Sequence, residues 1–179
     1  MKTLARVFAR LLPSTICLLL GAITCNHVLM AQQTEKDQPS DATICTFEDG
    51  KQISARYNAV VVGRSEGAAT GKVWMPGGSA ITLFTDTELT VDKTRIPTGA
   101  YTVYLIPGKK NWTLIVSRNV VVQGRYDEKQ DLVRAAMETG MLSEAEERLR
   151  VTFGHIGPKQ CEMNVDYGKT RTWIEFKEN

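Results

Sequence analysis

The fold of this chain is decided by the stretch Ala100-Tyr-Thr-Val-Tyr-Leu-Ile106, Pro107-Gly-Lys-Lys-Asn111, Trp112-Thr-Leu-Ile-Val116. Two apolar runs flank a short polar turn, and both runs are rich in the β-branched and aromatic residues that favour strands. A Pro-Gly pair opens the turn, as is typical of chain reversals. The stretch therefore predicts a central hairpin of two antiparallel strands.

Segments on both sides of this hairpin repeat the strand pattern. Upstream, Thr43–Phe47 and Ile53–Tyr57 alternate apolar and polar residues around an Asp-Gly pair, which is a strong hairpin signal. Downstream, the alternation returns in Leu149–Phe153, Cys161–Val165 and Thr170–Phe176. Closely spaced short strands of this kind predict a mainly β fold, and we expect an antiparallel two-sheet β-sandwich.

Two further segments interrupt the strand pattern. Good helix formers accumulate before residue 148, and Ser143 followed by Glu146 resembles a capping box, so a short helix is expected around residues 143–148. Tyr167-Gly168-Lys169 is predicted to be a turn between the last two strands. The predicted domain thus contains at most one short helix.

The N-terminal residues have the order of a secretory signal peptide. Basic residues precede the apolar run Leu11–Thr24, which is short for a bilayer span, and Ala31 offers a small residue for cleavage. We expect residues 1–31 to be a signal peptide, residues 32–42 a flexible linker and residues 43–179 a single domain. Two alternatives stay open, namely an uncleaved anchor helix and a lipoprotein attached through Cys25 after a loosely matching cleavage box.

Removal of the signal peptide changes the charge balance. It takes away three basic and no acidic residues, which leaves 19 basic and 20 acidic side chains. No clustered basic face of the kind that binds nucleic acid is apparent. No later segment is long and apolar enough to span a membrane. We therefore expect a periplasmic or secreted protein that does not bind nucleic acid and has no membrane span after cleavage.

Two cysteines, Cys45 and Cys161, remain in the expected mature chain. An oxidising compartment favours a disulfide between them, while two free buried thiols are the alternative. Both cysteines lie on apolar faces of predicted strands, so a bridge inside or across the sheets is geometrically reasonable.

Several short motifs carry a family resemblance that extends from about Cys45 to Phe176. They are Cys45-Thr-Phe-Glu-Asp-Gly-Lys51, Gly71-Lys-Val-Trp74, Ile96-Pro-Thr-Gly-Ala-Tyr-Thr102, Ile106-Pro-Gly108, Trp112-Thr-Leu-Ile-Val116, Tyr126-Asp-Glu-Lys-Gln-Asp-Leu132, and Cys161 through Asp166 with Thr170-Arg171. On these motifs the chain resembles the exported bacterial family called domain of unknown function 2911. The resemblance implies export and a β-rich fold, and it implies no activity.

One segment departs from that family pattern. The family typically has Val-Trp-Arg-Thr-Gly-Ala-Asn-Glu, whereas this chain has Met75, Ser79 and Ala80 in place of the arginine, asparagine and glutamate. Arginine and glutamate side chains could orient a polar or anionic ligand through charge-assisted hydrogen bonds, which methionine and alanine cannot make. The degenerate motif indicates either a lost or altered ligand site, or a repacked structural loop.

The sequence contains few candidates for catalysis. His155 is the only histidine after residue 31, and a metal site or a Ser-His-Asp arrangement would have to use it. None of the common nucleophile, zinc or phosphate-loop motifs occurs. Asp127, Glu128 and Asp131 form an acidic cluster that we interpret as a solvated, charge-balanced loop. We expect no cofactor and no metal.

The remaining candidates are aromatic and polar residues that could contact a ligand. Trp74, Trp112 and Trp173 could line a sugar- or peptide-binding surface, although tryptophans in a β domain of this size are more often core residues. The candidate binding residues are Trp74, Met75, Ser79, Trp173 and His155. We expect a non-catalytic domain that binds a small ligand or an envelope component. The alternatives are a hydrolase that uses His155 with carboxylates, and a structural envelope protein.

Overall fold

The computed structural model describes residues 40–179 except for residues 64–67 and 121–124. The predicted signal peptide, Cys25 and the first part of the predicted linker lie outside the described residues. The last part of that linker is already strand, because β1 begins at Ser40. No helix within the described ranges has the length and hydropathy that a bilayer span requires.

Strands dominate the described residues, which contain no α-helix and two single-turn 3₁₀ helices. The elements are β1 (Ser40–Thr46), β2 (Gln52–Asn58), η1 (Pro76–Gly78), β3 (Ile81–Thr85), β4 (Leu89–Val91), β5 (Thr94–Ile96), β6 (Gly99–Ile106), β7 (Trp112–Ser117), η2 (Glu128–Gln130), β8 (Asp131–Gly157) and β9 (Gln160–Glu178). The predicted mainly β, antiparallel character is confirmed.

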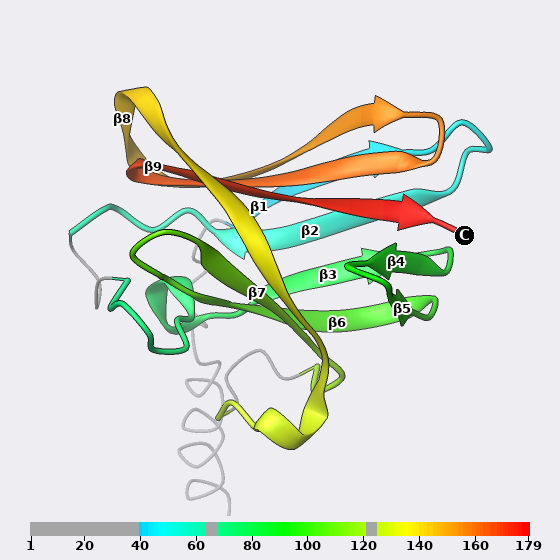
Figure 1. Ribbon diagram of the computed structural model, residues 1–179, viewed down its shortest axis with the longest axis horizontal. Helices are drawn as coiled ribbons and strands as arrows, with labels where there is room; N and C mark the ends of the chain where they lie inside the picture. Colours follow the sequence, from blue (N-terminus) through cyan, green and yellow to red (C-terminus); the bar gives the residue numbers. More distant parts are fainter. Residues whose placement is uncertain (1–39, 64–67, 121–124) are drawn as a thin grey trace, which may run out of the picture. The chain divides into compact units, whose positions relative to one another are not determined.

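The nine strands form one hydrogen-bonded sheet with the order β1-β2-β3-β6-β7-β8-β9-β4-β5. The sequence predicted two separate sheets, but β8 is long enough to join them into one. Its first residues pair with β7, and residues from Glu138 onward pair with β9. Figure 1 shows β8 rising from the level of β7 to the β8–β9 pair.

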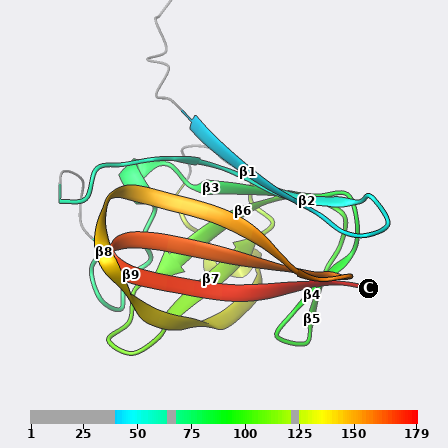
Figure 2. The same cartoon turned by 90° about the horizontal axis from the view of Figure 1, so that it is seen from above.

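A single buried cluster holds this sheet together. Every strand contributes at least one apolar side chain to it, from Cys45 on β1 to Phe176 on β9. The sheet must therefore curve around one core, and Figure 2 shows the β8–β9 pair lying over β6 and β7. Burial of this many apolar side chains is the main favourable contribution to folding.

Both predicted hairpins are confirmed. β1 and β2 pair with Cys45 opposite Ile53, and the turn between them contains Gly50 with φ +90°, which glycine adopts without strain. β6 and β7 pair with Leu105 opposite Leu114. In the β6–β7 turn, a Cβ on Gly108 would lie 1.9 Å from the backbone oxygen of Asn111, so this tight turn excludes any larger residue.

The predicted helix at residues 143–148 is wrong, because these residues belong to β8. Their backbone groups bind a distant segment instead of forming helical hydrogen bonds. The Val62 amide donates to the Glu147 carbonyl at 2.9 Å, and the Leu149 amide donates to the Val60 carbonyl at 2.8 Å. These tertiary hydrogen bonds outweigh the modest helix propensity of the segment.

The predicted turn at Tyr167-Gly168-Lys169 is also wrong, because β9 continues through it. Gly168 has φ +59° and lies where the β8–β9 register shifts twice. Here the long segment of β8 from Met141 to Arg150 faces only the short segment of β9 from Asp166 to Thr170. The glycine therefore marks a bulge, at which β8 accommodates extra residues and bends.

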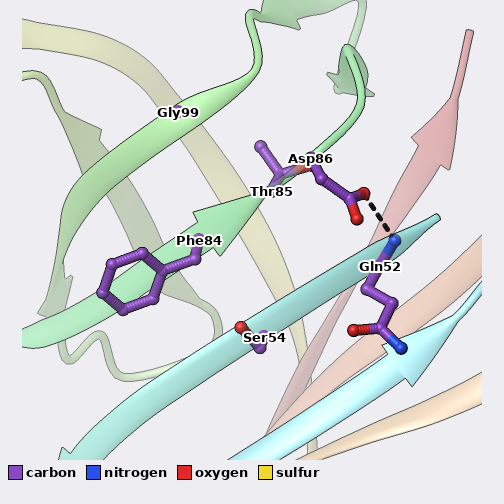
Figure 3. A pocket seen from close by; sticks show the side chains of 6 residues that line it. All are labelled: Gln52, Ser54, Phe84, Thr85, Asp86 and Gly99. Atoms are coloured by element: carbon purple, nitrogen blue, oxygen red, sulfur yellow. Dashed lines mark hydrogen bonds between the residues drawn. The ribbon is translucent and has the colours of Figure 1, made fainter.

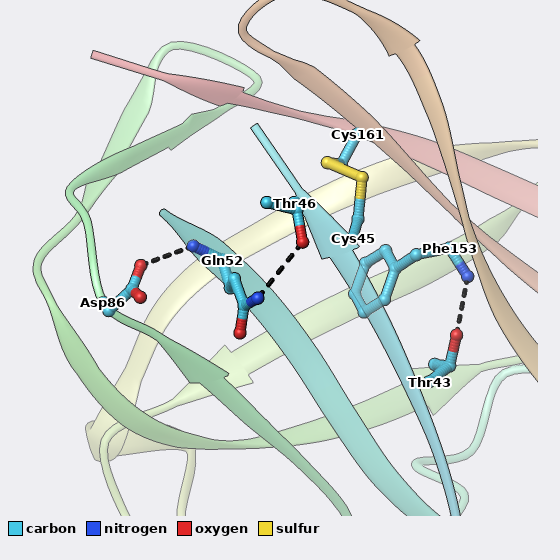
Figure 4. The surroundings of a disulfide bond; sticks show 7 residues. All are labelled: Thr43, Cys45, Thr46, Gln52, Asp86, Phe153 and Cys161. Carbon is cyan, nitrogen blue, oxygen red and sulfur yellow. Dashed lines mark hydrogen bonds between the residues drawn. A yellow bond between two sulfur atoms is a disulfide. The ribbon is translucent and has the colours of Figure 1, made fainter. Parts of the chain in front are cut away.

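Strand β1 contacts the β8–β9 pair through a disulfide and a hydrogen bond to a side chain. The predicted disulfide joins Cys45 on β1 to Cys161 on β9, with an S–S distance of 2.04 Å and a Cα–Cα distance of 6.3 Å. Beside it the Phe153 amide donates to Thr43 Oγ1 at 3.0 Å, as Figure 4 shows. We call this contact between β1 and the β8–β9 pair the seam.

Candidate functional site

Trp74 belongs to the buried core cluster. Its backbone forms an isolated bridge with Leu105, and its side chain is only 5% exposed. The Trp74 ring packs edge-on against Trp112, at a centroid distance of 5.9 Å, and against Tyr167, at 4.8 Å. This aromatic cluster joins the loop before β3 to β7 and β9. A ligand contact by Trp74 stays a prediction.

Met75 and Ser79 flank the 3₁₀ turn η1, which leads from Trp74 into β3. Both side chains are half-buried. The Gly78 amide donates to the Met75 carbonyl at 3.1 Å, and the Ser79 amide donates to the Pro76 carbonyl at 3.4 Å. The degenerate motif thus forms a compact turn that does not itself contain a charged side chain.

Trp173 and His155 lie toward opposite ends of the β8–β9 pair. Trp173 is opposite Glu138 and packs over Gly140, where a Cβ would lie 3.2 Å from the indole ring. His155 is exposed and lies opposite Cys161, and its imidazole makes no hydrogen bond or ion pair with any described residue. The structure does not bring these two candidate residues together, and their binding roles stay predictions.

A charged cluster that the sequence analysis missed lies at the bend of β8 and β9. Asp166, whose side chain is 1% exposed, accepts hydrogen bonds from Arg171 at 2.7 and 2.8 Å and from Arg150 at 2.9 Å. Arg150 also pairs with Glu146 at 2.7 Å. Each charge in this cluster has a partner of opposite sign, so the cluster braces the bend and presents no unpaired charge to a ligand.

The electrostatic state of Asp166 follows from this arrangement. Burial alone would raise the pKa of its carboxyl group, because desolvation penalises the charged form. The hydrogen bonds and charges of Arg171 and Arg150 outweigh burial and hold this pKa below its usual value. Asp166 therefore stays ionised and is unsuited to act as an acid near neutral pH.

The acidic cluster around η2 pairs with an arginine on β8 that the sequence analysis did not consider. Arg134 binds Asp131 at 2.6 Å and Glu128 at 3.2 Å. The Tyr126 hydroxyl donates to Asp131 at 2.6 Å, and its ring packs against Tyr104 at 5.0 Å. Burial, followed by the hydrogen bond to Asp131, raises the pKa of Tyr126 to about 12. Arg134 thus pairs with two of the three acidic side chains, and Tyr126 covers the Tyr104 side of β6.

A shallow hollow of about 320 Å³ lies on the face of β2, β3 and β6 that points away from the core. It is lined by Gln52, Ser54, Phe84, Thr85, Asp86 and Gly99, as Figure 3 shows. Phe84 faces outward because Ile81 and Leu83 of the same strand face the core. The residues opposite Phe84 on the neighbouring strands are Ser54 and Ala100, and their small side chains leave part of the phenyl ring exposed.

Hydrogen bonds hold the polar end of the hollow in place. The backbone N–H of Gln52 donates to Asp86 Oδ1 at 2.6 Å, and the backbone N–H of Asp86 donates to the backbone carbonyl of Gln52 at 3.2 Å. The Gln52 side chain donates to Thr46 Oγ1 at 3.2 Å. At the other end, the Arg56 guanidinium lies over the Phe84 ring, 5.9 Å from its centroid. The hollow thus combines an aromatic wall with fixed polar groups.

A sequence signal for this hollow existed. In Ile81-Thr-Leu-Phe-Thr85 the alternation that places Ile81 and Leu83 inside requires Phe84 to point outward, where an aromatic residue is uncommon. The small neighbours of Phe84 could not be recognised, because the strand register across β2 and β6 is a tertiary property.

Comparison with known proteins identifies the family. A family model described as a protein of unknown function (DUF2911) matches residues 39–176, nearly all of the chain after the predicted linker. The chain belongs to this family. No curated protein and no solved structure matches it. In this DUF2911 member the matched region includes the hollow, the disulfide and the braced bend.

Membership of the DUF2911 family does not indicate an activity, so a function must be inferred from the residues of this chain. No group of three or more His, Cys, Asp or Glu side chains within the described ranges could hold a metal ion. Asp166 is committed to two arginines, and no carboxylate of the described chain lies within hydrogen-bond distance of His155. Among the sites described, the Phe84 hollow is the one whose aromatic and polar groups face solvent together.

Proposed function

We propose that this DUF2911 member is an exported, non-catalytic domain that binds a small ligand or an envelope component. The binding surface is the outward face of β2, β3 and β6 around Phe84. The observation that carries this proposal is the hollow beside Phe84, an exposed aromatic ring next to hydrogen-bonding groups in a protein whose other large aromatic rings are mostly packed.

Export is supported by two independent features. The first residues have the charge and apolar pattern of a signal peptide. The buried Cys45–Cys161 disulfide is typical of oxidising compartments such as the periplasm. A mature protein that begins at Gln32 would reach the periplasm or the medium, whereas lipidation at Cys25 would keep it attached to a membrane.

The geometry favours binding over hydrolysis. A hydrolase that uses His155 would require a carboxylate or a nucleophile within hydrogen-bond distance of the imidazole. His155 is exposed and makes no such contact with any residue that the structure describes. A purely structural envelope protein remains the competing proposal, and it predicts that no small ligand binds.

Two measurements test the proposal. The complete chain is produced in a bacterial host, and the N-terminus and location of the product are determined; a product in the cytosol that retains Met1 would refute export. The exported product is then screened by thermal shift against metals, sugars, peptides and lipids. Preferential binding to the folded state raises the melting temperature, so a silent panel would favour the structural protein.

A further inference from the structure

The hollow beside Phe84 has a composition that selects one class of ligand. We propose that it binds a neutral saccharide unit, with the sugar ring against Phe84 and its hydroxyl groups on Gln52, Ser54 and Asp86. This inference rests on the proposed binding function and adds the ligand class to it.

The aromatic wall provides the first requirement. Phe84 is 37% exposed although it lies in the middle of a sheet, between Ser54 and Ala100. Directly opposite residues in neighbouring strands have Cβ atoms about 5 Å apart, so small partners leave room at the sides of the ring. A phenyl ring offers a flat apolar face, which matches the face of a sugar ring that carries only C–H groups.

The polar groups provide the second requirement. Asp86 uses Oδ1 to accept from the Gln52 amide, while Asp86 Oδ2, Gln52 Oε1 and Ser54 Oγ make no hydrogen bond with any described residue. These three oxygens can accept hydrogen bonds from ligand hydroxyl groups. The hydrogen bond between β2 and Asp86 fixes the carboxylate, which reduces the entropy lost when a ligand binds.

Charge and polarity exclude the other ligand classes. A purely apolar ligand would take water from these oxygens without replacing its hydrogen bonds, which is unfavourable. Asp86 repels an anion, and Arg56 over the Phe84 ring repels a cation at the aromatic wall. Asp86 lines the polar end of the hollow and Arg56 lies over the Phe84 ring, so the two ends carry opposite charges, which favours a neutral, hydroxyl-rich ligand over either ion.

The size of the hollow sets the expected strength of binding. A volume of about 320 Å³ is at the lower end of ligand sites, and it fits one or two sugar units. Because such a shallow site buries little area, we expect dissociation constants on the order of 0.1–1 mM. Binding of this strength becomes useful when a polymer presents many copies of the sugar.

The test is an NMR titration of the exported protein with neutral monosaccharides and disaccharides built from glucose, galactose, mannose and N-acetylglucosamine. At least one sugar is expected to shift the backbone amide signals of residues 52–54, 84–86 and 99 in a saturable way. Phe84→Thr, which retains a good strand former, should weaken this binding about tenfold. Asp86→Asn, which retains the acceptor for the Gln52 amide, should weaken it about threefold.

The control is Met141→Ala, which removes an exposed apolar side chain from β8 outside the hollow, and it should leave the affinity unchanged. The inference is overturned if no sugar shifts these amides, if sugars shift a different face, or if lysine, arginine or phosphate shifts them more strongly. The proposed binding function survives that result when a peptide or a lipid micelle shifts the same amides. It fails together with the saccharide inference when no probe does.

Discussion

The Cys45–Cys161 disulfide should contribute a large share of the stability of this protein. It joins residues 116 positions apart, and in the chain-entropy model a closed loop of this length stabilises the folded state by about 5 kcal/mol. Reduction of the bond should therefore lower the free energy of unfolding by about that amount. The total for a domain of this size is only about 5–15 kcal/mol.

The assay is urea unfolding of the oxidised protein, the reduced protein and the variant Cys45→Ala/Cys161→Ala. We expect the variant to lose about 1–2 kcal/mol more than the reduced protein, because both sulfur atoms are buried and their removal leaves a cavity. The melting temperature of the reduced protein should fall by about 15 °C. The denaturant slope should rise on reduction, because the opened chain exposes more surface when it unfolds.

Thr43→Val is the matched control at the seam. It removes the acceptor for the Phe153 amide without touching the cross-link, and it should cost only about 1 kcal/mol. If the reduced protein is within about 1 kcal/mol of the oxidised protein, loop closure does not stabilise this fold and the reasoning is refuted.

Three further predictions concern the bend and the turns. Asp166→Asn should cost about 1–3 kcal/mol at pH 7, and it should abolish a stability loss that the parent protein shows as the pH falls below about 4. The pKa of Asp166 is lower in the folded protein than its ordinary value of 3.8, so the ionised carboxylate stabilises the folded state at any pH above 3.8. This stabilisation disappears as the pH falls through the lowered pKa. If Asp166→Asn left the acid unfolding profile unchanged, the prediction would be wrong. Gly168→Ala should lower the free energy of unfolding by about 1 kcal/mol, because φ of Gly168 is +59°. Gly154→Ala is the control: Gly154 has no positive φ and no atom near its Cβ position, so the same urea unfolding assay should show almost no change. Gly108→Ala should cost about 2–4 kcal/mol, since its Cβ would overlap the Asn111 carbonyl, and a stable variant with an intact β6–β7 register in NMR would disprove that contact.

The sequence analysis is wrong where contacts with distant segments override the local conformational preference of the residues. Residues 143–148 contain good helix formers, yet Val60 and Val62 bind the adjacent backbone and keep this segment extended. Gly168 looks like a turn residue in the sequence, whereas the structure uses its positive φ for a bulge inside β9. In both cases the deciding partner lies far away in the chain.

None of the residues that line the proposed hollow was selected as a site candidate from the sequence. Trp74 was selected as a candidate binding residue, although a core position is more common for such a tryptophan, and in the structure it packs against Trp112 and Tyr167. Phe84 was not selected, although its outward position follows from the alternation around it. Residue type and spacing indicate which side of a strand a residue occupies, but they do not reveal what covers that side.

Residue patterns alone were enough to predict the β character, the hairpins β1–β2 and β6–β7, and the pair of cysteines available for a disulfide. These features depend on alternation along one strand and on turns between neighbours in the chain, so their information is local. The residue patterns did not reveal that β8 joins the nine described strands into one sheet, that Asp166 lies between two arginines, or that Phe84 faces solvent beside small neighbours. Those outcomes depend on pairing between segments far apart in the sequence. Such pairing is stabilised by packing of the whole core, which no single segment reveals.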